Sequence, residues 1–366
     1  MKKQWRLLSF VSLLALLLGG CGKAFQSTLI PQGDVAKMQY DLLLLASAIM
    51  VGVVLVVTII FLYVFVRFRQ KKGQGDYIPE HVEGNHKLEI IWTVIPIILF
   101  LILAVPTVTY TFKLADVSAM EKKNIDKDTI VVDVTANLYW WEFSYKSEKI
   151  VTSQDLVIPT GKKVYLNLKG ADIKHSFWVP SLAGKMDTNT DNVNKMWLKA
   201  DKSGTYNGFC TEFCGPSHSL MQFKVKAFAE SEYKKWLAAM KIIDGKKVVA
   251  STKAQEGQEI FNKSCIGCHA VGSNDSRPPS ARIAPNLANF ADRDTVAGIA
   301  ENNEENLKKW LKDPENMKPG NKMNGKYGNL TDDQIDALNA YLQTLTVDQI
   351  DALDAKVKRD YSRRGG

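Results

Sequence analysis

Long apolar runs dominate the first 112 residues of the chain. A short run, Leu7–Leu18, follows three basic residues, which is typical of a secretory signal peptide. Two later runs contain almost no charged residues, and each is long enough to cross the hydrocarbon of a membrane as a helix. The predicted segments are a signal peptide over 1–20, an extracytoplasmic segment over 21–40, a first transmembrane helix over 41–66, a cytoplasmic loop over 67–89 and a second transmembrane helix over 90–112.

A basic cluster separates the two predicted spans and sets their orientation. Arg67, Arg69, Lys71 and Lys72 follow the first span directly. By the positive-inside rule this loop faces the cytoplasm, so both ends of the hairpin lie on the extracytoplasmic side. The net charge of +8 therefore needs no nucleic-acid partner to explain it.

The residues before Cys21 carry a second signal. The small pair Gly19-Gly20 precedes this cysteine, and the arrangement resembles the lipobox of bacterial lipoproteins. Cleavage there would leave Cys21 as a diacylated N-terminus that anchors the chain to the lipid bilayer. Ordinary signal cleavage nearby, or a retained segment with an unmodified cysteine, is the alternative.

Beyond the hairpin the pattern changes to short runs of β-branched and aromatic residues. Runs such as Ile130–Val134 and Val164–Leu168 are separated by turn signals such as Pro159–Lys162. This spacing predicts an all-β sandwich or barrel. The predicted segments are the all-β domain over 125–229, a helix and Lys-rich linker over 230–253, an all-α domain over 254–345 and a C-terminal tail over 346–366.

A nine-residue repeat lies near the end of the chain, where residues 330–338 recur with small changes at 345–353. Each copy has a threonine followed three residues later by a glutamine, which is the pattern of a capping box. The repeat therefore predicts two helix starts, at Thr331 and at Thr346.

Soft metal ligands gather in one short segment of the all-β region. Cys210, Cys214, His218 and Met221 lie within twelve residues, and His175 is the candidate for a second histidine. Thiolate, imidazole and thioether ligands suit copper, and the second cysteine implies two thiolates that bridge two copper ions. Zinc, which two cysteines and two histidines can hold tetrahedrally, is the alternative.

The all-α region carries the signature of covalent haem attachment. Cys265, Cys268 and His269 form a C-x-x-C-H motif, in which the thiols bind the haem vinyl groups and the imidazole becomes the proximal iron ligand. A methionine, which raises the reduction potential, is the expected sixth ligand. Met323 follows a Pro-Gly turn similar to the one that presents this ligand in class I cytochromes c, whereas Met317 precedes the turn.

The two metal motifs together resemble subunit II of the caa3-type bacterial cytochrome c oxidases. The resemblance implies a multidomain fold with a two-helix transmembrane hairpin, an all-β cupredoxin-like CuA domain and an all-α class I cytochrome c domain. It also implies that the chain accepts electrons from a donor cytochrome c on haem c and passes them through binuclear CuA to haem a of subunit I. Oxygen would there be reduced to water with coupled proton pumping.

The scarcity of histidine limits the part that this chain plays. The chain has five histidines, of which three are assigned as ligands, while His81 and His86 lie between the predicted spans. The oxygen-reducing centre must then lie in another subunit, and no catalytic residue for that step is expected here. The resemblance implies that this is subunit I, with haem a3 and CuB. The electron-input subunit of a CuA-containing nitric oxide reductase is the alternative function, and a copper-delivery lipoprotein is the non-redox rival. The expected location is the bacterial cell membrane, with the N-terminus and both metal domains outside.

The resemblance extends to residues beyond the ligand sets. Glu212 would offer its backbone carbonyl to copper and its carboxylate to a magnesium ion at the subunit I interface. Tyr139, Trp140 and Trp141 match an aromatic strand over the copper site that holds the electron-input residue. Glu89 matches a glutamate at the mouth of a proton path into subunit I. The alternatives are a solvated loop glutamate for Glu212, core packing for the three aromatic residues and helix capping for Glu89.

Overall fold

The computed structural model describes Leu13, residues 22–70, residues 83–243, Val249 and residues 251–347, together with five residues between 71 and 82. The rest of the predicted signal peptide, Cys21, and the second copy of the C-terminal repeat from residue 348 onward lie outside the described residues. The chain forms two compact units. Residues 37–116 make up one unit, and the other contains the chain up to Ala36 and from Val117 onward.

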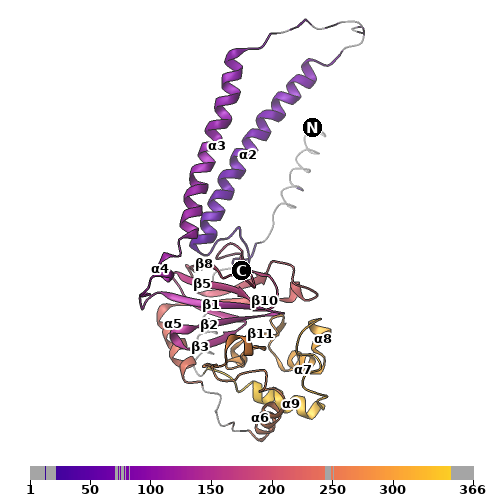
Figure 1. The fold of residues 1–366 in the computed structure, drawn as a ribbon. Helices are drawn as coiled ribbons and strands as arrows, with labels where there is room; N and C mark the ends of the chain where they lie inside the picture. The colour runs from indigo at the N-terminus through magenta and orange to yellow at the C-terminus, as the bar shows by residue number, and fades with distance from the viewer. Residues whose placement is uncertain are drawn as a thin grey trace. The chain divides into compact units, whose positions relative to one another are not determined.

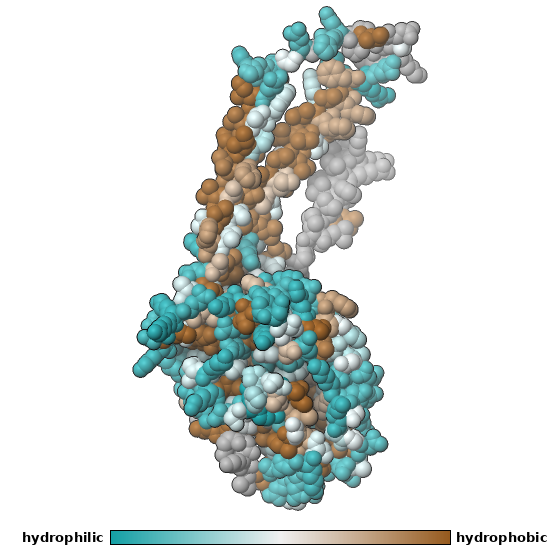
Figure 2. All heavy atoms as spheres, viewed as in Figure 1, coloured by the Kyte–Doolittle hydropathy of each residue, from teal (hydrophilic) through white to brown (hydrophobic). Residues whose placement is uncertain are grey.

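Two long apolar helices make up the first unit (Figure 1). Helix α2 spans Asp34–Arg67 and helix α3 spans His86–Ala115. Most of their apolar side chains are exposed, and Figure 2 shows hydrophobic surface along the helices between hydrophilic ends. At about 1.5 Å per residue, each helix is longer than the roughly 30 Å of hydrocarbon that a membrane span must cross. The two predicted apolar helices are therefore confirmed, and each extends beyond its apolar run.

Two five-stranded sheets form a β-sandwich in the second unit. One sheet has the strand order β3-β2-β1-β5-β8, and the other has the order β4-β10-β9-β6-β7. The predicted all-β domain is thus confirmed. The strands are β1 Ile130–Asn137, β2 Trp140–Tyr145, β3 Ile150–Ser153, β4 Asp155–Pro159, β5 Val164–Gly170, β6 His175–Trp178, β7 Met186–Thr188, β8 Asn194–Leu198, β9 Gly204–Cys210 and β10 Gln222–Phe228.

Aromatic side chains from both sheets meet in the core of the sandwich. Trp141 and Phe143 of β2 pack on Phe223 of β10, with ring centroids 5.1 and 5.9 Å away. Phe177 of β6 stacks on the same Phe223 ring at 4.7 Å. A Cβ atom on Gly208 of β9 would lie 2.2 Å from that ring, so only glycine leaves room for it. This packing makes a rigid base for the loops at the ends of the strands.

The C-terminal segment folds into packed helices, as predicted. Helix α6 crosses α9 so closely that a Cβ atom on Gly257 would lie 1.9 Å from the carbonyl oxygen of Ala337. Thr331 and Gln334 form the predicted capping box at the start of α9. The remaining α-helices and strands are α4 Ser118–Glu121, α5 Glu230–Lys241, α6 Thr252–Ser264, β11 Thr295–Val296, β12 Ala300–Glu301, α7 Glu304–Lys312, α8 Pro314–Met317 and α9 Asp332–Leu342. Together the hairpin, the sandwich and these helices confirm the fold class, while the exact domain boundaries stay predictions.

Candidate metal centres

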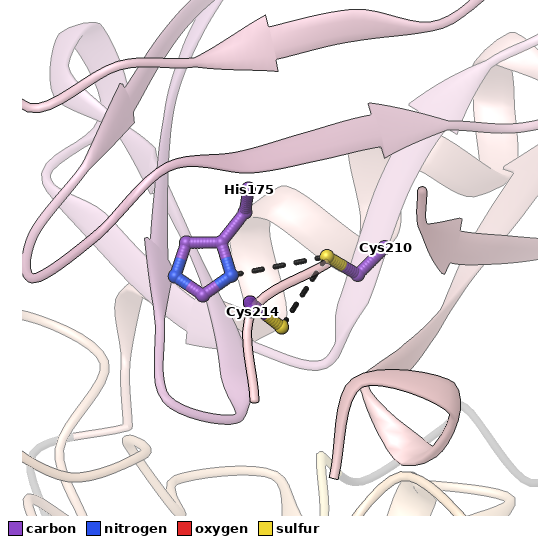
Figure 3. Close-up of side chains that lie close together, drawn as sticks. All are labelled: His175, Cys210 and Cys214. Carbon is purple, nitrogen blue, oxygen red and sulfur yellow. Dashed lines mark hydrogen bonds between the residues drawn. The ribbon is translucent and has the colours of Figure 1, made fainter. Parts of the chain in front are cut away.

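The pairing of two strands creates the first candidate centre. His175 begins β6 and Cys210 ends β9, and the strands pair antiparallel with Phe177 opposite Cys210. This places His175 Nδ1 3.8 Å from Cys210 Sγ, although 35 positions separate the two residues. The loop after β9 returns Cys214, whose Sγ lies 3.7 Å from Cys210 Sγ. Figure 3 shows the imidazole and the Cys214 thiol converging on the Cys210 sulfur.

Three further donors complete this cluster. His218 Nδ1 lies 3.5 Å from Cys214 Sγ, and the sulfur of the buried Met221 lies 3.9 Å from the same thiol. The backbone carbonyl oxygen of Glu212 lies 3.3 Å from Cys210 Sγ. All six predicted copper ligands are thus brought together at one end of the sandwich.

The donor set fits a pair of copper ions better than one zinc ion. A tetrahedral zinc site uses four ligands, whereas this cluster offers two thiols, two imidazole nitrogens, one thioether and one carbonyl oxygen. Each imidazole lies against a different thiol, as expected where two thiolates are shared between two ions. The thioether and the thiolates are soft ligands, which favour copper.

The two thiols differ in acidity because they share one buried site. Hydrogen bonds from Cys214 and His175 lower the pKa of the Cys210 thiol well below its usual value. The hydrogen bond to Cys210 and the burial of Cys214 raise the pKa of the second thiol well above its usual value. Since both sulfurs bind metal as thiolates, metal binding must release the remaining proton.

Asp172 holds the imidazole of His175 in place. Its Oδ1 lies 3.0 Å from His175 Nε2, so the other ring nitrogen, Nδ1, faces the thiols. Asp172 also accepts hydrogen bonds from the Leu138 backbone at 2.8 Å and from Lys322 Nζ at 2.9 Å. Burial opposes a charge on His175, but the hydrogen bonds to Asp172 and Cys210 outweigh it and raise the pKa of the imidazole.

The second candidate centre is a cavity of about 750 Å³ beside the C-x-x-C-H motif, which is within the usual size range for a cofactor pocket. Cys265, Cys268, His269 and Met323 all line it. His269 Nδ1 donates a hydrogen bond to the carbonyl oxygen of Pro285 at 2.7 Å, which leaves Nε2 as the nitrogen for iron. Burial lowers the pKa of His269 and thereby favours the neutral form that binds metals. These residues fit a covalently bound haem.

The two candidate methionines differ in position. Met323 follows the Pro-Gly turn and packs against the core of the helical domain at the cavity wall. Met317 ends helix α8 and is not among the described residues that line the cavity. The geometry is therefore the one expected if Met323 faces the haem.

Comparison with known proteins identifies the family. Residues 23–110 match the transmembrane domain of cytochrome C oxidase subunit II, residues 118–228 match its periplasmic domain and residues 254–346 match cytochrome c. Cytochrome c oxidase subunit 2 of Bacillus sp. (strain PS3) is 59% identical to this chain, over 93% of this chain and 97% of its own length. The chain belongs to the cytochrome c oxidase subunit II family. The cytochrome c match makes it a form of subunit II with a fused cytochrome domain.

Other relatives of this subunit II agree with the assignment. Cytochrome c oxidase subunit 2 of Bacillus subtilis (strain 168) is 52% identical over 94% of this chain and 98% of its own length. Quinol oxidase subunit 2 of Bacillus anthracis is 38% identical over 64% of this chain and 80% of its own length. The chain is therefore a subunit of an oxidoreductase complex that also contains subunit I, and the matched families indicate haem c and CuA. These relatives give no support to the nitric oxide reductase alternative.

The three aromatic residues of subunit II, Tyr139, Trp140 and Trp141, lie near the two centres. Tyr139 and Trp140 line the haem cavity. Trp141 lies on the copper side, where its Nε1 donates to the carbonyl oxygen of Met221 at 3.5 Å and its ring centroid is 6.3 Å from that of His175. Trp141 therefore packs in the core, whereas Tyr139 and Trp140 form part of the wall of the cavity.

The two glutamates of interest lie on exposed surface. Glu212 Oε2 is 3.6 Å from Lys185 Nζ, and 40% of its side chain is exposed, so the carboxylate is open to a ligand from outside the chain. Glu89 lies in the first turn of α3 with half of its side chain exposed. The N-cap of α3 is Asn85, whose side chain accepts from two backbone amides, so Glu89 itself is not the capping residue.

Sequence reasoning missed three residues that lie near the two centres. Asp172 precedes His175 by three positions, a spacing that could have marked it as a partner for that histidine. Ser217 Oγ donates to the carbonyl oxygen of Pro319 at 2.6 Å, and Lys318 is buried with its Nζ donating to the Ala297 carbonyl oxygen. No sequence signal points to the last two, because their partners lie 102 and 21 positions away.

Proposed function

We propose that this subunit accepts electrons from a donor cytochrome c on its helical domain and delivers them through its copper domain to haem a of subunit I. One observation carries the proposal: the two candidate centres share a wall. Tyr139, Trp140 and Asp172 of the copper domain line the haem cavity, and Asp172 also bonds the candidate copper ligand His175. Haem c and the copper pair supply one-electron transfer when bound.

The haem would be held by four residues of the helical domain. Cys265 and Cys268 would bind it covalently, and His269 would bind the iron through Nε2. The hydrogen bond from His269 Nδ1 to Pro285 supports this role because it fixes the ring orientation. Met323 would supply the sixth ligand from the loop after α8.

The copper pair would be held by five side chains and one backbone group. Cys210 and Cys214 would bind the ions as thiolates, with His175 and His218 binding through Nδ1. Met221 and the backbone carbonyl of Glu212 would complete the set. Support comes from the convergence of these donors within hydrogen-bonding or sulfur-contact distance of the two thiols.

Two glutamates would serve the contact with subunit I. The exposed carboxylate of Glu212 would bind a magnesium ion shared with that subunit, since carboxylates are ordinary magnesium ligands. Glu89 would stand at the mouth of a proton path into subunit I. Glu212→Gln should then abolish a Mn²⁺ signal in complexes loaded with manganese in place of magnesium, and an unchanged signal would exclude this site.

The membrane anchoring of the subunit would combine two helices and a lipid. The basic residues after α2 support a cytoplasmic loop, with the N-terminus and both metal domains on the extracytoplasmic face. Cys21 would carry the acyl chains. Mass spectrometry of the mature N-terminus tests this last point, because a mass without acyl groups excludes lipidation.

The purified oxidase complex tests the main proposal. It should contain haem c that stays bound after denaturation, haem a, and a copper signal delocalised over two ions, and it should consume oxygen when supplied with reduced cytochrome c. A localised single-copper spectrum would overturn the CuA assignment. Turnover of nitric oxide without oxygen consumption would overturn the oxidase function.

A further inference from the structure

A buried ion pair joins the copper domain to the cytochrome domain. Glu142 lies in β2, and Arg282 lies in the long loop between the haem motif and α7. The guanidinium binds both carboxylate oxygens, with Nε at 3.1 and 3.0 Å and Nη2 at 2.8 Å. The two side chains are 4% and 9% exposed, so the pair is almost fully removed from solvent.

The pair joins strand β2 to residues that contact the haem motif. On one side, Glu142 follows Trp141, whose Nε1 bonds the backbone of Met221. On the other side, Arg282 Nη1 donates to the carbonyl oxygen of Arg277 at 2.7 Å. Arg277 Nη1 in turn donates to the carbonyl oxygen of Cys268 at 3.0 Å. A short series of hydrogen bonds therefore runs from the aromatic strand to the haem motif.

Other hydrogen bonds near the pair also join the copper domain to the cytochrome domain. The Val151 amide donates to the Ser273 carbonyl oxygen, and the Asn286 amide donates to Ser153 Oγ, both at 2.9 Å. These bonds are made by β3 and its end, beside the strand that carries Glu142. Hydrogen exchange at the Val151 and Asn286 amides therefore shows whether the two domains are in contact.

The energetics of the pair favour a role in orientation. Burial raises the pKa of Glu142 above its usual value even though Arg282 lies beside it, so the attraction does not fully offset the cost of desolvation. Apolar residues of similar volume often stabilise such a boundary as well as a buried ion pair does. A two-pronged contact between guanidinium and carboxylate, however, restricts the relative orientation of its two partners.

We propose that Glu142 and Arg282 form a docking latch that holds the haem-binding loop against the aromatic strand β2 of the copper domain. The cytochrome domain then donates electrons from one fixed position, and free movement on its Lys-rich linker is not needed. Glu142 and Arg282 act as positioning residues, because neither lies in a predicted ligand set. The electron-transfer part of this inference rests on the proposed function, whereas the docking part does not.

The test uses the purified complex with four variants: Glu142→Gln, Arg282→Gln, the double variant, and Asp336→Asn as a control. Asp336 forms an exposed pair with Lys308 inside the cytochrome domain, at 2.9 Å. Two quantities are measured: hydrogen exchange at the Asn286 and Val151 amides, and the rate of electron transfer from haem c to CuA after photochemical reduction of the haem.

Each single variant leaves a buried charge without its partner, so exchange at both amides should rise at least about tenfold and electron transfer should slow. The double variant should lie closer to the wild type because no unpaired charge remains. Asp336→Asn should change neither quantity. If a single glutamine variant fails to assemble, Arg282→Lys carries the test, and it should show a smaller change of the same sign.

Wild-type exchange and wild-type electron transfer in Glu142→Gln would overturn the latch, provided that the haem and copper spectra are intact. Absence of those spectra in the wild type would instead overturn the proposed function. The exchange measurement would still decide whether the domains are latched, so the two failures are distinguishable.

Discussion

Asp172 should control how tightly the copper site holds its metal. The carboxylate fixes His175 through Nε2, and its side chain is only 16% exposed. Partners that orient a metal-binding histidine typically change metal affinity about 10–100-fold when they are mutated. We therefore expect Asp172→Asn and Asp172→Ala to weaken copper binding without removing any copper ligand.

The size of each effect follows from the hydrogen bonds that are lost. The amide introduced by Asp172→Asn would keep an oxygen that accepts from His175 but would lose the negative charge, and charge makes a hydrogen bond roughly twice as strong. Alanine removes the acceptor altogether. We expect about a tenfold loss of copper affinity for Asp172→Asn and about a 100-fold loss for Asp172→Ala, or about 1.4 and 2.7 kcal/mol.

The assay is competition for copper with a chelator, followed by the CuA absorption and paramagnetic resonance spectra. Asp187→Asn is the matched control, because Asp187 is also a carboxylate near this site but pairs with Lys174 at 3.6 Å instead of a ligand. Haem c content should be equal in all variants. If Asp172→Ala retains copper as tightly as Asp187→Asn, the carboxylate does not position His175 and the reasoning is wrong.

Two further predictions concern the cytochrome domain. Gly257→Ala should destabilise the α6–α9 crossing by about 1–3 kcal/mol because the added Cβ would meet the Ala337 carbonyl oxygen. Thermal unfolding followed at the haem absorption would detect this loss. An unchanged melting temperature would show that the helices can separate at no cost. Met323→Ala should leave the haem covalently bound but lower its reduction potential, whereas Met317→Ala should leave the potential unchanged. Redox titration decides between the two methionines, and the opposite outcome would assign the ligand to Met317.

Much of the architecture can be predicted from local patterns. The two membrane helices follow from uninterrupted apolar runs, because a span needs only length and apolar composition. The C-x-x-C-H motif and the loop from Cys210 to Met221 are equally local, since their ligands lie on one short segment. The capping box at Thr331 was also predictable, because both of its partners belong to the same turn.

The remaining features depend on contacts between distant segments. His175 meets Cys210 only because β6 pairs with β9, and no periodicity specifies which strands become neighbours. The shared wall of the haem cavity and the Glu142–Arg282 pair require two domains to pack, with partners 140 positions apart. Local sequence patterns indicate which face of a helix or strand is apolar, but they do not indicate which other element that face will pack against. The ligand sets were therefore evident in the sequence, whereas the position of one centre relative to the other was decided by tertiary packing.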